Sequence, residues 1–146
     1  VSIKPYATVS SLPMLYADKV LAIVQRPYLK PRDYFDLWWI RKSANLPAHN
    51  TWKDDFLDKL EVNFSIYKTD GTNFVYDLGN KIQADQSKFL DSQQLSNDLK
   101  NWLPRKTFQV LMSNNAFEDI EKFVKNELIS IHETLEEHYL DSSPSL

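Results

Sequence analysis

Residues 17–37 hold the side chains whose types and spacing suit chemistry on a phosphate group. Lys19 and Arg26 are seven positions apart, about two turns of an α-helix, so on a helix they share one face. Asp33 and Asp36 are three apart and also share one side of the helix that carries them. If the two helices pack as a hairpin, the two cations meet the two carboxylates beside an apolar core.

This cluster has two interpretations. The first is a salt bridge that fixes the angle between two helices, with Asp33 favoured near a helix N-terminus by the helix dipole. The second is a phosphate site, in which Lys19 neutralises a triphosphate as a point charge and Arg26 grips it through a fork of donors. In such a site an Asp orients those groups or the incoming hydroxyl. The residue pattern alone favours the structural interpretation.

The wider pattern Lys-x2-Ala-x3-Arg, followed by Lys-Pro-Arg-Asp-x-x-Asp-Leu, resembles the third motif of the AbiEii/AbiGii family. Members of this family are bacterial toxins with a nucleotidyltransferase fold, often encoded beside an antitoxin. The resemblance is specific over Leu12–Ile40 and general beyond it, since the family continues into a variable helical domain. It makes the phosphate site the favoured interpretation. The matching residues are Lys19, Ala22, Arg26, Pro31, Arg32, Asp33, Asp36 and Leu37.

The resemblance implies an activity and a role for each residue. The activity is transfer of a nucleotide from an NTP to an acceptor, with tRNA as an acceptor class among relatives. Lys19 would bind the triphosphate, and Arg26 and Arg32 would be further nucleotide-binding residues. Asp33 and Asp36 are the candidate catalytic residues, which would support catalysis or hold the motif together.

The resemblance also implies Mg2+ as a cofactor of the full-length parent protein. In the family, the metal ions are bound by an Asp-x-Asp pair near a Gly-Ser turn, and this first motif is absent from the sequence. Neither Gly71 nor Gly79 precedes such a pair, so we expect this chain to bind no metal. The motif would lie upstream of Val1, and the chain alone is expected to be inactive.

The expected fold class is mainly α: a helical bundle preceded by one N-terminal strand, as the C-terminal half of a nucleotidyltransferase-like α/β protein. Val1–Val9 alternates weakly, as is typical of an edge strand. Leu12–Arg26 and Pro31–Ser43 show helical apolar spacing, and their short link makes them neighbours. Residues 69–73 predict a turn. Further helices are expected from Asn50 or Thr51 onward and at Phe74–Gln83, Ser92–Leu103, Phe108–Asn114 and Ala116–Leu140.

Three parts of the chain are expected. Residues 1–45 would form the end of the nucleotidyltransferase core, residues 46–140 a C-terminal helical domain, and residues 141–146 a tail. The sequence starts with Val and contains only 2 glycines, which is expected of a chain whose glycine-rich part lies upstream.

Composition excludes several classes of function. The chain has no cysteine, which excludes disulfides and thiolate catalysis, and no apolar run approaches the roughly 18 residues of a membrane span. We expect a cytoplasmic protein that does not enter a membrane. The net charge of −3 counts against a dedicated nucleic-acid-binding domain, and no DNA partner is expected. Lys30–Lys42 has four basic residues against two Asp, so a local basic site is compatible with this charge.

Other groups of residues have simpler explanations. His132 and His138 are six positions apart, so on a helix they point about 120° away from each other, which opposes a shared metal ion. The tryptophans lie mostly at the spacing of core residues. One small basic–aromatic group is a candidate RNA contact and consists of Lys100, Trp102, Arg105 and Lys106.

Two functions from different classes stay open at this point. The first is the nucleotidyltransferase toxin, whose partners would be an NTP and an acceptor such as tRNA. The second is a non-catalytic helical module that binds a partner protein, such as an antitoxin, through its aromatic faces. A Gly-Ser turn and an Asp-x-Asp pair encoded upstream of Val1 would favour the first, and a gene that begins near Val1 would favour the second.

Overall fold

Helices dominate the two ranges that the computed structural model describes, residues 11–83 and 89–140. The mainly α class is confirmed, and no strand occurs within these ranges. The strand predicted at Val1–Val9 lies outside the described residues. None of the described helices is both long and apolar enough to cross a membrane. In chain order the elements are α1 (Ser11–Gln25), α2 (Pro31–Lys42), η1 (His49–Trp52), α3 (Lys53–Phe64), α4 (Gly71–Gln83), α5 (Ser92–Leu99), α6 (Arg105–Ser113) and α7 (Ala116–Tyr139).

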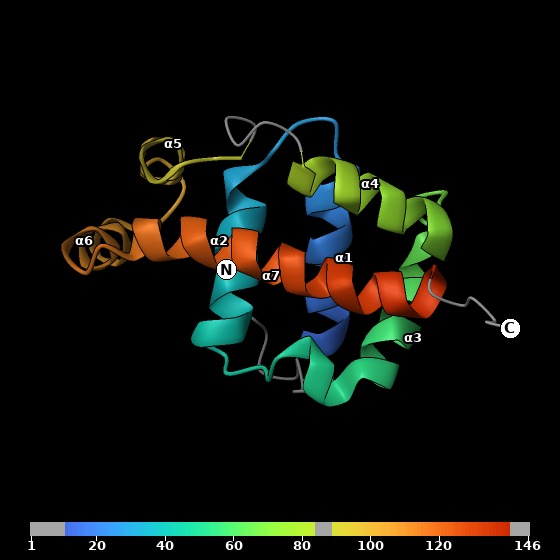
Figure 1. Ribbon diagram of the computed structural model, residues 1–146. Coiled ribbons are helices and arrows are strands. Elements are labelled where there is room, and N and C mark those ends of the chain that lie inside the picture. The colour runs from blue at the N-terminus through green and yellow to red at the C-terminus, as the bar shows by residue number, and fades with distance from the viewer. Residues whose placement is uncertain (1–10, 84–88, 141–146) are drawn as a thin grey trace, which may run out of the picture.

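The longest helix, α7, runs across the pair formed by α1 and α2 (Figure 1). It packs against α2, α4, α5 and α6, whereas α1 packs against α2, α3 and α4. α1 and α2 lie side by side and run in opposite directions (Figure 1). The predicted helical hairpin is therefore confirmed, and it forms one layer on which α7 rests.

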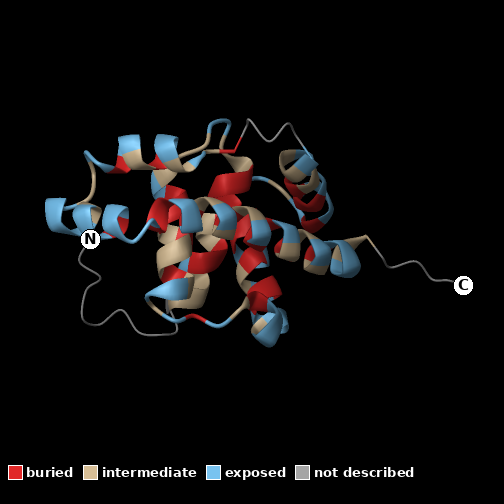
Figure 2. Cartoon of the chain, turned by 60° about the vertical axis from the view of Figure 1, so that its left-hand side comes forward, coloured by how far each residue is buried: buried red, intermediate tan, exposed pale blue. Residues whose placement is uncertain are grey.

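The core is built around the C-terminal half of α1. Every residue from Val20 to Val24 is at most 5% exposed, so this stretch is apolar and covered on all sides. α7 instead buries one stripe of residues three or four positions apart and turns polar residues to solvent (Figure 2). Because α1 is central, a side chain at its edge is held against neighbours that are themselves packed. The stripe on α7 consists of Ile120, Val124, Leu128, Ile131 and Leu135.

The start of α4 differs from the prediction. The helix begins at Gly71, three residues before the expected Phe74. The carboxylate of Asp70 accepts a hydrogen bond from the backbone N–H of Asn73 at 2.8 Å, which satisfies one of the free donors of the first turn. The turn predicted at residues 69–73 is thus the beginning of the helix.

The segments around α5 and α3 also differ in their bounds. α5 ends at Leu99, before the expected Leu103, and Pro104 disfavours helical backbone in the residue that precedes it. α6 then begins directly after Pro104.

The third predicted helix starts as the short 3₁₀ turn η1, and α3 follows it from Lys53.

Buried residues from both sides of residue 45 form one continuous core. Tyr34 and Leu37 of α2 belong to the same cluster as Phe56, Phe74 and Leu128 of the later helices. The division into a core end and a helical domain at residue 45 stays a prediction, and the two parts share this core.

Gly71 is predicted to be essential where α4 meets the end of α7. A Cβ atom there would overlap the ring of Tyr139, so Gly71→Ala must displace that ring. We expect the free energy of unfolding to fall by about 2 kcal/mol, within the range for overpacked sites, as measured by urea denaturation. Gly79→Ala is the comparison, because its Cβ atom would lie 3.0 Å from the side chain of His132, a tight contact that a shift of a few tenths of an ångström relieves. Equal stability of the two variants would contradict the prediction.

Candidate functional site

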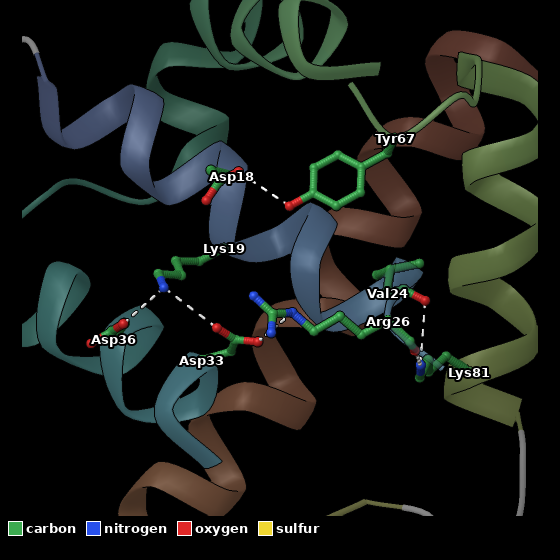
Figure 3. Close-up of polar contacts among 8 residues, drawn as sticks. All are labelled: Asp18, Lys19, Val24, Arg26, Asp33, Asp36, Tyr67 and Lys81. Carbon is green, nitrogen blue, oxygen red and sulfur yellow. Dashed lines mark hydrogen bonds and ion pairs between the residues drawn. The ribbon is translucent and has the colours of Figure 1, made fainter. Parts of the chain in front are cut away.

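The helix pair brings together the four residues that the spacing predicts to meet (Figure 3). Lys19 Nζ of α1 lies 2.9 Å from Asp36 Oδ2 and 3.4 Å from Asp33 Oδ1, both on α2. Arg26 Nε lies 3.2 Å from Asp33 Oδ2. We call these four residues the ion-pair cluster. The exposed fraction is 2% for the side chain of Asp33 and between 19% and 30% for the other three, so the cluster is open to solvent on one side.

Asp33 is the buried centre of the ion-pair cluster. It lies in the first turn of α2 after Pro31, where the positive end of the helix dipole favours a carboxylate. Its Oδ1 accepts a hydrogen bond from Lys19. Arg26 is within ion-pair distance of Oδ2, but the direction of its N–H does not complete a hydrogen bond. Asp33 therefore keeps one buried oxygen that is held by charge alone.

The charge of Lys19 is stabilised by its two carboxylate neighbours. Partial burial disfavours the ammonium form, but hydrogen bonds and charges from Asp36 and Asp33 outweigh it and raise the pKa of Lys19 above its ordinary value. Lys19 is thus protonated at neutral pH.

Two further contacts hold α1 in place around the ion-pair cluster (Figure 3). The hydroxyl of Tyr67 donates a hydrogen bond to Asp18 at 3.3 Å. Lys81 Nζ, from α4, donates to the backbone carbonyls of Val24 and Arg26 at 3.3 and 3.1 Å. These carbonyls belong to the end of α1, where acceptors lack helical partners and a cation is favoured. Burial lowers the pKa of Lys81 below its ordinary value.

Arg32 stands apart from the other predicted site residues. It is exposed, and its guanidinium carbon lies 5.0 Å from the ring centroid of Trp102, in the segment between α5 and α6. Consecutive residues of a helix point about 100° apart, so Asp33 can face α1 while Arg32 faces α5. The structure therefore divides the predicted residues between two sides of the first turn of α2.

A cavity of about 760 Å³ opens beside the C-terminal end of α1. Gln25 and Pro27, which flank Arg26 in the chain, both line it. Gln25 also donates a hydrogen bond to Asp77 of α4 at 3.1 Å. The cavity thus lies at the same end of α1 as Arg26 and has mixed polar and apolar walls, but no residue of the ion-pair cluster lines it. Its lining consists of Val24, Gln25, Pro27, Leu29, Asp77, Asn80, Lys81, Phe89 and Leu90.

Comparison with known proteins identifies the family. The model of the family described as nucleotidyl transferase AbiEii toxin, Type IV TA system, matches residues 4–126. The chain belongs to this family. The match includes the whole ion-pair cluster and helices α1 to α6, so the resemblance seen in the third motif is confirmed at the level of the family. No curated protein and no solved structure matches the chain.

The described side chains of this AbiEii-family chain do not fit the Mg2+ that the resemblance implies. In residues 11–83 and 89–140, no group of three or more His, Cys, Asp or Glu residues is arranged to hold a metal ion. The carboxylates of Asp33 and Asp36 are each already paired with a cationic side chain. We therefore assign no chemical step to a metal ion bound by these residues.

A second polar junction, around Glu127 of α7, is not singled out by the sequence analysis. Glu127 is 6% exposed, and its Oε2 accepts hydrogen bonds from the hydroxyl of Tyr16 at 2.5 Å and from Arg41 Nε at 2.8 Å. The junction ties α7 to both α1 and α2. Its one sequence signal is a carboxylate within the apolar stripe, between Val124 and Leu128. Burial, together with the charge of Glu127, raises the pKa of Tyr16 well above its ordinary value.

His49 of η1 is buried close to this junction. Its Nε2 lies 2.8 Å from Thr134 Oγ1, whereas its Nδ1 has no hydrogen-bond partner among the described residues. Burial lowers the pKa of His49 below the ordinary value of 6.5, and the opposing charge of Glu127 does not outweigh it. The charge of Arg41 acts in the same direction as burial. The folded protein therefore favours neutral His49.

The lowered pKa of His49 predicts a loss of stability in acid. The folded state binds fewer protons here than the unfolded state, so the contribution of His49 is complete above pH 6.5 and declines as the pH falls below it. We expect urea denaturation from pH 7.5 to 5.5 to show a steeper fall in unfolding free energy for the unchanged chain than for His49→Gln. Parallel pH profiles would contradict this assignment, because His132 and His138 are common to both proteins.

The unequal burial of the two carboxylates predicts unequal effects on stability. Asp33→Asn removes a buried charge that two cations share, and we expect the unfolding free energy to fall by about 2 kcal/mol. Asp36→Asn leaves Lys19 paired with Asp33, and a partly exposed pair contributes less than about 1 kcal/mol. Thermal and urea denaturation of both variants measure the difference. A larger loss in Asp36→Asn would show that Asp33 is not the centre of the helix contact.

Proposed function

We propose that this chain takes part in the transfer of a nucleotide from an NTP to a hydroxyl acceptor such as tRNA. The observation that carries the proposal is the ion-pair cluster, partly open to solvent, in a member of the nucleotidyl transferase AbiEii toxin family. The ion-pair cluster can both fix the angle between two helices and bind phosphate, because the contacts that hold α1 to α2 also hold two cations beside solvent.

Lys19 and Arg26 are the proposed phosphate-binding residues. Lys19 is protonated, and the nearer of its two partners, Asp36, is the more exposed one. A phosphate oxygen that arrives from solvent can replace Asp36 at the ammonium while Asp33 keeps Lys19 in place. The guanidinium of Arg26 has further donors besides the Nε that lies near Asp33, and a planar fork suits phosphate oxygens.

Asp33 and Asp36 have different proposed roles. In nucleotidyl transfer the acceptor oxygen attacks the α-phosphorus, the bond to the β-phosphate oxygen breaks, pyrophosphate leaves and the acceptor hydroxyl loses its proton. Asp36 has the exposure needed to orient that hydroxyl or accept its proton once a phosphate holds Lys19. Asp33 is buried and is proposed as a positioning residue for the two cations.

The cavity beside the end of α1 is the proposed place for the nucleoside. Its volume of about 760 Å³ falls within the range of small-molecule sites. Asn80 supplies a polar group and Leu29 and Leu90 supply apolar walls. Arg32, the other predicted nucleotide contact, does not line this cavity and lies over the ring of Trp102.

The metal-binding groups needed for the reaction would come from the full-length protein, which would act in the cytoplasm. As the resemblance implies, the carboxylates that bind Mg2+ would be encoded upstream of Val1, and residues 1–146 alone would bind NTP weakly and transfer no nucleotide. The toxin–antitoxin description of the family supports an antitoxin as a partner. A non-catalytic module that binds such a partner is the competing function.

Lys19→Met in the full-length gene product is predicted to abolish most of the nucleotide transfer. We expect a fall of about 100-fold in label incorporated from radiolabelled NTPs into tRNA, because one fixed cation at the transferring phosphates is lost. The affinity for NTP, measured by calorimetry, should fall with it. Lys53→Met is the control, since Lys53 is exposed at the start of α3.

The outcomes of this experiment separate the competing interpretations. Full activity of Lys19→Met would show that the ion-pair cluster only fixes the angle between α1 and α2. No transfer by any full-length protein, with antitoxin binding retained, would favour the non-catalytic module. Strong labelling by residues 1–146 alone would overturn the placement of essential carboxylates upstream of Val1.

A further inference from the structure

The segment between α5 and α6 carries a basic surface next to the ion-pair cluster. We define the Trp102 patch as Trp102 with four exposed cations, Arg32, Lys100, Arg105 and Lys106. In the described parts of the chain, no carboxylate lies within ion-pair distance of any of the four. Although the net charge of the protein is −3, these four cations are exposed and have no ion-pair partner among the described residues.

Helix stability does not explain the cations of this patch. Arg105 and Lys106 occupy the first turn of α6, which contains no acidic residue. The helix dipole places partial positive charge at that end, so cations there are unfavourable by a few tenths of a kcal/mol to about 1 kcal/mol. Residues that weaken their own helix and pair with no carboxylate are better explained by an anionic partner.

Trp102 and Arg32 form a stacked pair at the centre of the patch. The edge of Trp102 is fixed by Phe35, whose ring centroid lies 5.9 Å away at an interplanar angle of 75°. Arg32 lies over the ring of Trp102 and is itself exposed. Unpaired bases stack on aromatic rings and on arginine planes, and surrounding cations bind the phosphodiester backbone. This combination fits a single strand of nucleic acid better than an acidic peptide, because an acidic peptide has no bases to stack on Trp102 and Arg32.

The patch lies on the same turn of α2 as the buried carboxylate of the ion-pair cluster. Arg32 and Asp33 are consecutive residues, with Arg32 over Trp102 and Asp33 bound to Lys19 and Arg26. The first turn of α2 therefore belongs both to the Trp102 patch and to the proposed phosphate site.

We infer that the Trp102 patch binds a single-stranded segment of the acceptor nucleic acid. One base stacks on the Arg32–Trp102 pair, and the backbone phosphates contact Lys100, Arg105 and Lys106. The inference rests on the proposed function for the identity of the acceptor, and it adds a surface to which the family match assigns no role. The shared chemistry is that of a phosphodiester strand with an unpaired base, from RNA or from DNA.

Fluorescence anisotropy with labelled 12-nucleotide single strands tests the patch. The full-length protein is titrated with RNA and with DNA of one mixed sequence, at several salt concentrations. We expect Arg105→Gln/Lys106→Gln to raise the Kd about tenfold and to reduce the slope of log K against log salt by about 1.4, because each lost phosphate contact removes about 0.7. Lys53→Gln/Lys68→Gln removes two exposed charges on and after α3 and should change neither value.

Two further variants separate this inference from the proposed function. Arg32→Lys keeps the charge but loses the planar group, so it should weaken strand binding several-fold with an unchanged salt slope. Lys19→Met should lose NTP affinity and keep strand affinity, whereas the patch variants should do the reverse. If Lys19→Met keeps its NTP affinity, the proposed function fails. The strand affinities of the patch variants still test the Trp102 patch in that case.

Three results would overturn the inference. One is that the unchanged protein binds neither strand, and another is that the double variant binds like the Lys53→Gln/Lys68→Gln control. The third is that the patch variants lose NTP affinity to the same extent, which would place these cations in the nucleotide site. Tighter binding of RNA would identify the acceptor strand as RNA, and tighter binding of DNA would contradict the tRNA acceptor but support the patch.

Discussion

The contact between α1 and α2 depends on one carboxylate that is buried between two cations. Asp33 is almost inaccessible to solvent, yet Lys19 of α1 and Arg26, which directly follows α1, both reach it while keeping part of their own surfaces in water. Removing a charge from water is costly unless partners compensate, so this arrangement permits only a narrow range of positions for the two helices. Because α1 is also the centre of the apolar core, the same constraint orients the elements that pack around it.

The ion-pair cluster has two cations and two anions, so its net charge is zero before any ligand arrives. A triphosphate therefore has to compete with Asp36 for Lys19, and the greater exposure of Asp36 makes it the partner that can be displaced. Asp33 cannot leave in the same way, because its burial holds it at the helix contact. A phosphate site built in this way stays folded without its ligand, and its cations are already oriented when the ligand binds.

α7 gives the hairpin its second support. Glu127 binds Tyr16 of α1 and Arg41 of α2 within an otherwise apolar stripe, so one buried carboxylate links three helices. At the opposite end of α2, the first turn presents Asp33 to α1 and Arg32 to Trp102. One short helix thus connects the proposed phosphate site, the basic surface and the long helix that covers the core.

Local information in the sequence was sufficient for the helix pair and for the meeting of Lys19 with Asp33 and Asp36. Prolines bound both helices, the link is short, and helical periodicity then leaves few ways to pack two neighbouring apolar faces. The third motif likewise indicated the family that the comparison confirms. The sequence misplaced the start of α4 and the end of α5, because a side-chain cap and a proline act over single residues.

Only the tertiary structure decided which charges are buried and which partners they have. The sequence shows Glu127 as a carboxylate within the apolar stripe of α7 but not its partners, and it groups Arg32 with Asp33 in one motif. Their environments come from segments 86 and 70 positions away along the chain, at Arg41 and Trp102. Burial and long-range pairing are properties of how helices pack, and no local pattern of residue types encodes them.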